Sequence, residues 1–227
     1  MSHRDIDQQR DHYVNIMGQD LGSQFAALWQ QVAHLHLKWH QYVELFGKRP
    51  QRIEILNKAA PAFFGLLQAI LWEDILLHIA RLTDSPGKGR TKKLTILSFP
   101  RLIADPTIKS AVQTAVDEAV SKTNFCRDWR NRHIAHLNLD LEIDTNAKQL
   151  ESASRQLVGE ALNAIVATLN ELDGHFCKSE TRFEINSDVG GALSLLHVVN
   201  DGLRAQAERE ARLLRGEWHP KDSPRDI

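Results

Sequence analysis

The sequence predicts an all-α protein built as a bundle of long helices, and three observations lead to this fold class. Apolar residues recur at spacings of three and four over most of the 227-residue chain, which is the period of an amphipathic helix. Seven prolines and twelve glycines are too few for a collagen-like or linker-rich chain. A hydrophobic content of 42% is enough, at this length, to bury a sizeable core.

The first half of the chain is expected to hold two long helical stretches. One carries a single apolar stripe over residues 25–46 and ends at Gly47 and Pro50. The other spans about 51–81, with a kink or a new first turn at Pro61. Its apolar positions cover most of its circumference, which is typical of the central helix of a bundle.

A loop at 85–90 separates these stretches from a third long helix, which is expected to run from Pro106 to roughly His136. The period then changes, because apolar and acidic residues alternate over 139–143 as in a short strand. A second extended piece at 181–186 could pair with it, so a minor two-stranded ribbon is expected.

Two more helices, over about 152–178 and 188–215, form an additional C-terminal helical pair. The prolines near the end of the chain indicate a frayed tail. The expected organisation is an N-terminal segment (1–20), a helical core (21–150), C-terminal helices packing on the same domain (151–215) and a flexible tail (216–227).

Charge and cysteine content narrow the class of protein. A net charge of −1 excludes a globally basic nucleic-acid coat but not a local basic site. Cys126 and Cys177 are too far apart for a Cys-x-x-Cys pair, which fits a reducing compartment. The start lacks the apolar segment of a signal peptide, and the apolar run at 59–72 is broken and too short for a bilayer. We therefore expect a cytoplasmic protein with no membrane partner.

The densest chemical cluster lies between Arg127 and His136, with three guanidiniums, an amide and two imidazoles within ten residues. Guanidinium groups bind phosphate oxygens, and imidazoles transfer protons near neutral pH. Metal-free RNA cleavage needs such groups: a base on the 2′-hydroxyl, a cation on the phosphorane and an acid on the leaving 5′-oxygen. Because Arg and His at this spacing also occur by chance, the wider context must support the assignment.

That context is an ordered set of motifs similar to the AbiU-type abortive-infection branch of the HEPN superfamily. The runs that resemble it are LKWHQYVELFG (37–47), LNKAAPAFF (56–64), LWEDILL (71–77), RLTD (81–84), LT (94–95) and Arg130-Asn131-x(4)-His136. They cover roughly residues 20–140, and their order carries the specificity. The resemblance implies a HEPN-like helical bundle, a homodimer with a composite active site, and metal-independent endoribonuclease activity without a cofactor. It also implies a role in toxin or phage-defence systems, with RNA as substrate and an antitoxin protein as a further partner.

By the family's motif, Arg130, Asn131 and His136 match the functional positions. The resemblance implies that His136 acts as general base or acid, that Arg130 stabilises the phosphorane, and that Asn131 orients the phosphate or His136. Some HEPN toxins carry a tyrosine two residues after the histidine, which a partner enzyme modifies. Asn138 stands at that place here and departs from this route of neutralisation.

The helical geometry leaves a choice of cation. On an unbroken helix Arg130 and His136 lie about 120° apart, whereas Arg132 and His136, at i and i+4, share a face. Either the helix breaks near His136, or Arg132 is the working cation. The change of period at Leu139 favours a break and therefore Arg130.

Four residues are expected to support this site. They are Arg132, His133, Glu73 and Asp74. The two acids fall within an otherwise apolar helix, where buried charges need partners, so they either hold the basic cluster or form an Asp74–His78–Arg81 network on their own helix.

No metal ligand set is predicted, since His36 and His40 share a helix face without a carboxylate or cysteine at a fitting position. Two other functions stay open at this point. One is a catalytically silent HEPN module that binds RNA or a nucleotide, and the other is a helical scaffold that binds a partner protein.

Overall fold

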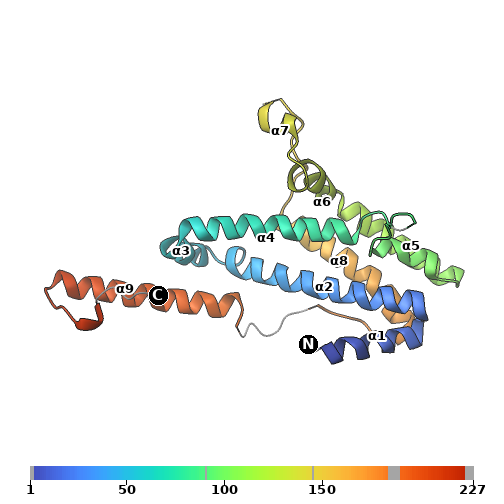
Figure 1. Cartoon of the computed structure of the whole chain (residues 1–227), viewed down its shortest axis with the longest axis horizontal. Helices are drawn as coiled ribbons and strands as arrows, with labels where there is room; N and C mark the ends of the chain where they lie inside the picture. Colours follow the sequence, from blue (N-terminus) through green and yellow to red (C-terminus); the bar gives the residue numbers. More distant parts are fainter. Residues whose placement is uncertain (1–2, 90, 145, 184–189, 223–227) are drawn as a thin grey trace. The chain divides into compact units, whose positions relative to one another are not determined.

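The structure is a computed structural model of the chain, and it describes residues 3–89, 91–144, 146–183 and 190–222 (Figure 1). These residues form helices and connecting loops, with no strand in the described ranges, which confirms the predicted all-α class. The α-helices are α1 (His3–Met17), α2 (Gln19–Phe46), α3 (Pro50–Ala59), α4 (Pro61–Leu82), α5 (Pro106–Lys122), α6 (Asn124–Trp129), α7 (Leu139–Ile143), α8 (Arg155–Leu172) and α9 (Ala192–Leu214). Shorter 3₁₀ and π segments are η1 (Ile96–Leu102), η2 (Arg130–Ile134), η3 (Asp173–Cys177) and η4 (Pro220–Asp222).

The N-terminal segment is helical, and glycine explains how it joins α2. Gly18, between α1 and α2, has a φ of +85°, a left-handed conformation that residues with a Cβ rarely adopt. A Cβ on Gly22 would lie 2.4 Å from the Tyr13 carbonyl oxygen, so α1 and α2 approach closely at this point. The turn and the close approach together place α1 against the start of α2.

Prolines set the starts of α3, α4 and α5, and α3 begins at Pro50. Pro61 begins α4 as a new first turn, because proline disfavours helical geometry at the preceding Ala60, which has φ −160° and ψ 78°. Pro106 begins α5, where the Asp105 side chain accepts the amide hydrogens of residues 107 and 108 at 2.8 and 3.2 Å.

The predicted ribbon is wrong, because 139–143 forms the short helix α7. The Asn138 side chain caps it by accepting the Leu141 amide hydrogen at 3.2 Å, and the acids Asp140 and Glu142 lie in the first turn, where the helix dipole favours them. An alternation over only five residues is therefore compatible with a capped helical turn. Of the expected partner at 181–186, residues 181–183 form no strand, and 184–186 lie outside the described residues.

The predicted helix from 106 to about 136 is divided at Thr123. This residue is buried, and its hydroxyl lies 2.8 Å from the Ala119 carbonyl oxygen and 3.0 Å from the Thr83 hydroxyl. A threonine that bonds to the preceding turn and to a neighbouring helix offers the backbone an alternative to continued helix. The chain therefore restarts as α6 and then becomes the π segment η2.

The chain divides into two compact units, which are described separately. Unit 1 comprises Met1–Trp39 and Leu71–Glu184, and unit 2 comprises His40–Ile70 and Ile185–Ile227. The predicted boundaries at residues 20, 150 and 215 stay a prediction. In unit 1, α5 packs along α8, and fully buried side chains from several helices form the core: Phe25, Leu28, Leu35, Ile75, Ile79, Phe99, Ile165 and Leu169.

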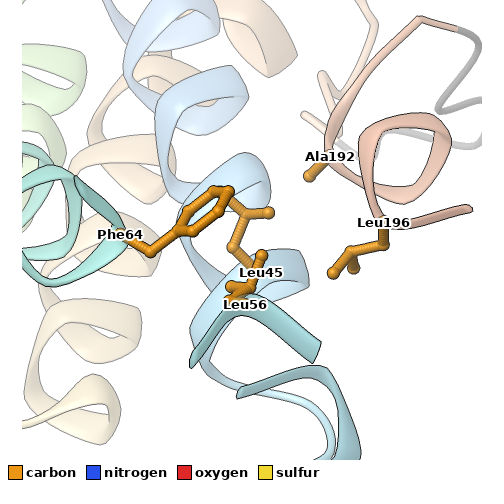
Figure 2. Packing of buried hydrophobic residues seen from close by; sticks show 5 residues of the cluster. All are labelled: Leu45, Leu56, Phe64, Ala192 and Leu196. Atoms are coloured by element: carbon orange, nitrogen blue, oxygen red, sulfur yellow. The ribbon is translucent and has the colours of Figure 1, made fainter. Parts of the chain in front are cut away.

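Unit 2 has a smaller core. Leu45, Leu56 and Phe64 lie together with Ala192 and Leu196 of α9 (Figure 2). The α9 start is also tied to α2, because the Ala192 amide donates to the Gln41 Oε1 atom at 2.6 Å. Burial of a few leucines and a phenylalanine, each contributing about 1.5–3 kcal/mol, therefore stabilises the packing of α3 against α9.

The prediction that no apolar stretch is long enough to span a bilayer is wrong for one helix, α4. α4 continues through the run at 59–72 to Leu82, and by length and composition this helix could cross a membrane. Only 22% of the relevant window is buried. A core helix of a soluble protein passes the same test, so this single helix is weak evidence, and the absence of a membrane partner stays a prediction.

Candidate functional site

The backbone that carries the predicted site is a π turn at the end of α6. The Ala135 amide donates to the Arg130 carbonyl oxygen at 2.8 Å, an i→i+5 bond that is rare and frequent at functional sites. Helical structure ends at Ile134, and the Asn138 amide then donates to the Arg132 carbonyl oxygen at 3.2 Å. The break expected near His136 is therefore present.

The Arg130 guanidinium is held on two sides. Its Nη1 atom lies 3.1 Å from Asp84 Oδ2, and its Nε donates to Asn131 Oδ1 at 2.9 Å. Both ionic side chains are about 20% exposed. Asn131 thus helps to orient Arg130, and its predicted role toward the phosphate or His136 stays a prediction. The guanidinium is therefore held by two partners, while the Arg130 side chain stays partly exposed.

Asp84 is a site residue that sequence reasoning missed. Its carboxylate also accepts from Lys93 Nζ at 2.7 Å and from the Ser85 amide at 3.0 Å. Partial burial raises the pKa of Asp84, but Lys93, the Ser85 amide and Arg130 outweigh burial and lower this pKa overall. Asp84 stood in the RLTD run, yet no sequence signal linked it to Arg130, 46 positions away.

Arg132 is engaged differently, because it fixes a loop. Its Nη1 lies 3.3 Å from Asp128 Oδ1 and 3.2 Å from the Gln149 carbonyl oxygen, and its Nη2 donates to the Lys148 carbonyl oxygen. Asp128 in turn accepts the Glu151 amide at 2.9 Å. The donors of Arg132 are therefore used to hold residues 148–151 against α6.

Arg127 is a structural clamp. Its guanidinium donates to the Thr83 and Val120 carbonyl oxygens at 2.9 and 2.7 Å and to Asn124 Oδ1 at 2.6 Å. Burial and the neighbouring charge of Arg130 lower the pKa of Arg127. Its contacts join α4, α5 and α6, so they set the position from which η2 starts.

The two predicted acids have separate partners. Glu73 lies near the cluster, with its Oε1 atom 3.4 Å from His133 Nε2. Asp74 instead accepts from Lys38 of α2 at 2.6 Å, and Lys38 lies 3.5 Å from His78 Nδ1. Glu73 therefore contacts the predicted cluster, whereas Asp74 contacts Lys38, which lies near His78, and the supporting role of the two acids stays a prediction.

His136 is exposed at the end of this segment. It forms no hydrogen bond, ion pair or ring contact with the described part of the chain, so its imidazole is free to meet a ligand. The chain after it is also exposed and apolar, with Leu137, Leu139 and Ile143 between 67% and 74% exposed. Figure 1 shows α7 extending beyond α6, away from α5.

The described residues contain no group of three or more His, Cys, Asp or Glu side chains arranged to hold a metal ion. The groups that this site offers are therefore a positioned guanidinium, an amide and a free imidazole. Such a set can bind a phosphate group and transfer a proton.

Comparison with known proteins agrees with the motifs in the sequence. Residues 18–188 match the family model HEPN_AbiU2, described as AbiU2. The match covers more than half of the chain and includes Arg130, Asn131 and His136. No curated protein and no solved structure matches the chain.

Proposed function

Because the chain belongs to the AbiU2 family of HEPN proteins, we propose that it is a metal-independent endoribonuclease that acts as a toxin in abortive infection. The observation that carries this proposal is the contrast between Arg130 and His136. Arg130 is fixed by Asp84 and Asn131, while the His136 imidazole is exposed and unengaged. A held cation and a free proton carrier within one short segment are groups suited to phosphoryl chemistry.

The reaction needs one bond to form and one to break. The ribose 2′-oxygen, after losing its proton to an imidazole, attacks the adjacent phosphorus. The bond from phosphorus to the 5′-oxygen breaks, and that oxygen takes up a proton. The products are a 2′,3′-cyclic phosphate and a 5′-hydroxyl end, and Arg130 stabilises the extra charge of the phosphorane.

We further propose that the protein works as a homodimer with a composite site. In-line cleavage requires a base and an acid on opposite sides of the phosphorus. One chain offers one free imidazole of this motif, His136. The exposed apolar residues Leu137, Leu139 and Ile143 directly follow it. An isologous interface over them would bring two His136 side chains together. The remaining proposed partners are RNA and an antitoxin protein, in the cytoplasm.

The experiment is incubation of the purified protein with mixed RNA in EDTA. Cleavage is expected to persist and to leave 2′,3′-cyclic phosphate ends, and His136→Ala is expected to abolish it without changing the circular dichroism spectrum. His133→Ala is the matched control and should do less, because His133 already contacts Glu73 and Trp129. Activity that vanishes with EDTA and returns with a divalent ion would refute the mechanism.

A second candidate is a catalytically silent HEPN module that binds RNA. The ion pairs of Arg130 with Asp84 and of Arg132 with Asp128 favour it, because both guanidinium charges are partly compensated within the chain. Its signature would be salt-dependent RNA binding without cleavage, and expression without toxicity.

A further inference from the structure

Unit 1 contains a cavity of about 500 Å³ that shares no residue with the Arg130–His136 segment. Its volume lies within the range of small-ligand sites. Three elements form its walls: α2 with His36 and Trp39, α8 with residues between Gly159 and Asn170, and the extended chain from Glu180 to Phe183. It is thus a site made by two helices and one extended segment.

The extended wall is fixed by side chains of α8 and its π continuation. Asn170 acts like a neighbouring strand, because its Oδ1 accepts the Thr181 amide at 2.9 Å and its Nδ2 donates to the Thr181 carbonyl oxygen at 3.1 Å. The Thr181 hydroxyl donates to the buried Asp173 carboxylate at 2.6 Å. The wall is therefore held in place before any ligand arrives.

Aromatic rings line one side of the cavity. His36 stacks on Phe183 with ring centroids 5.1 Å apart and planes at 24°. Trp39 lies one helical turn after His36 and also lines the cavity. Burial lowers the pKa of His36 to about 4, so this ring is neutral at pH 7. Its Nε2 atom is buried and has no hydrogen-bond partner among the described residues. Flat, uncharged rings of this kind favour a planar aromatic ligand.

Polar side chains also line the cavity. Asn163 is exposed, and its amide makes no hydrogen bond to the described part of the chain, so both its donor and its acceptor are available. Arg182 and Glu180 also line the cavity, are 72% and 63% exposed, and form an ion pair at 3.7 Å. The cavity thus combines an aromatic wall, a free amide and an exposed cation that pairs with Glu180.

Gly159 supplies an independent observation. It lies inside α8, where glycine is the least favourable residue after proline. A Cβ added there would meet no atom within 4 Å, so packing within the chain does not require glycine. The absence of a side chain at Gly159 does enlarge the cavity, since any side chain at this position would enter the open space.

We propose that this cavity binds a nucleobase, stacked on the aromatic wall, read by the Asn163 amide, with the phosphate of a nucleotide near Arg182. A nucleobase is planar and largely neutral, and it carries hydrogen-bond donors and acceptors on its edge. The base could belong to a free nucleotide or to an unpaired position of an RNA strand. The site is separate from the proposed cleavage site, so either assignment can fail without the other.

The test is calorimetric titration of the full chain with AMP, GMP, CMP and UMP, and with a short unstructured RNA on the His136→Ala variant. At least one ligand is expected to bind with a Kd below about 1 mM. Gly159→Leu should raise that Kd at least about tenfold by filling the cavity, and Asn163→Ala, a change at an exposed side chain, at least about threefold. Gly202→Leu is the matched control, since a Cβ at Gly202 of α9 also meets nothing within 4 Å, and it should leave Kd unchanged.

The mononucleotide and RNA titrations distinguish a base of a free nucleotide from a base of an RNA strand. Binding of a mononucleotide assigns the site to free nucleotides, and binding of the RNA alone, weakened by Gly159→Leu, assigns it to an RNA strand. Ribose 5-phosphate that binds as tightly as the mononucleotides would overturn the proposal, because the base would then contribute nothing. So would the absence of binding by every ligand at about 5 mM, or a Kd that Arg130→Ala raises while Gly159→Leu and Asn163→Ala do not.

Discussion

The Asp84→Asn variant tests how strongly the chain holds Arg130. Asparagine keeps an oxygen for the Ser85 amide but removes the charge that faces Lys93 at 2.7 Å and Arg130 at 3.1 Å. Lys93 is 53% exposed, so loss of its pair should cost about 0.5 kcal/mol. The Arg130 pair is only 20% exposed on each side and should cost about 1 kcal/mol. The expected loss is about 1.5 kcal/mol, or a Tm lowered by about 3–6 °C.

The pH dependence of this difference follows from the sign of the pKa shift. Because the folded-state pKa of Asp84 is lowered, the unfolded state takes up a proton first as the pH falls. The stabilisation by Asp84 is therefore complete above its unfolded pKa of about 3.9 and is lost as the pH falls through the folded value. The difference between wild type and Asp84→Asn should be constant from pH 7 to 5 and shrink below about pH 4.

Urea unfolding at several pH values measures this difference, with tryptophan fluorescence as the signal. Asp117→Asn is the matched control, since Asp117 is an exposed acid that accepts from Gln113 at 2.8 Å, and it should change stability by no more than about 0.5 kcal/mol. A loss at pH 7 equal to that of the control would show that Asp84 does not hold Arg130. A loss that stays the same in acid would show that its charge is not responsible.

Three further predictions concern other parts of the chain. Leu56→Ala, in the unit 2 core and 1% exposed, should destabilise that unit by about 2–4 kcal/mol in urea unfolding, whereas the more exposed Ile53→Ala should cost less than about 1 kcal/mol. Burial and Lys38 lower the pKa of His78 from 6.5 to about 4, so stability present above pH 6.5 should fall as the pH drops toward 4, and His78→Gln should flatten this slope. Arg132→Met should speed trypsin cleavage after Lys148, because the loop at 148–151 loses its anchor, and an unchanged cleavage rate would contradict this role.

Periodicity predicted most of the long helices because apolar residues recur along them at spacings of three and four. It failed where local hydrogen bonds outweigh the pattern. Thr123 interrupts a stretch whose apolar spacing continues from α5 into α6, because its hydroxyl bonds to Ala119 and Thr83. The 139–143 alternation is overridden by the Asn138 cap. In both cases a hydrogen bond from one side-chain oxygen determines the local backbone conformation. A pattern of apolar residues carries no information about such a hydrogen bond.

At the candidate site too, the sequence indicated the local residues but not their distant partners. Residue types and family motifs point to Arg130, Asn131 and His136 because these residues lie within one short segment, and their roles stay a prediction. They did not identify Asp84 and Lys93, since an ion pair between distant segments depends on how α4, the loop after it and α6 are placed. They also did not predict that Asp74 pairs with Lys38 of α2. Local chemistry could be predicted from the sequence, and the long-range partners of each charge could not.

The helix break explains why neighbouring arginines of one motif have different tasks. On a continuous α-helix, Arg132 would share a face with His136. The i→i+5 bond from Ala135 to Arg130 widens the turn, and Arg132 then bonds to Asp128 and the 148–151 loop. Arg130 pairs with Asp84 instead and stays partly exposed. The phosphate binding that we propose for Arg130 requires unused donors, because a guanidinium whose donors are all used by the chain has none left for a ligand.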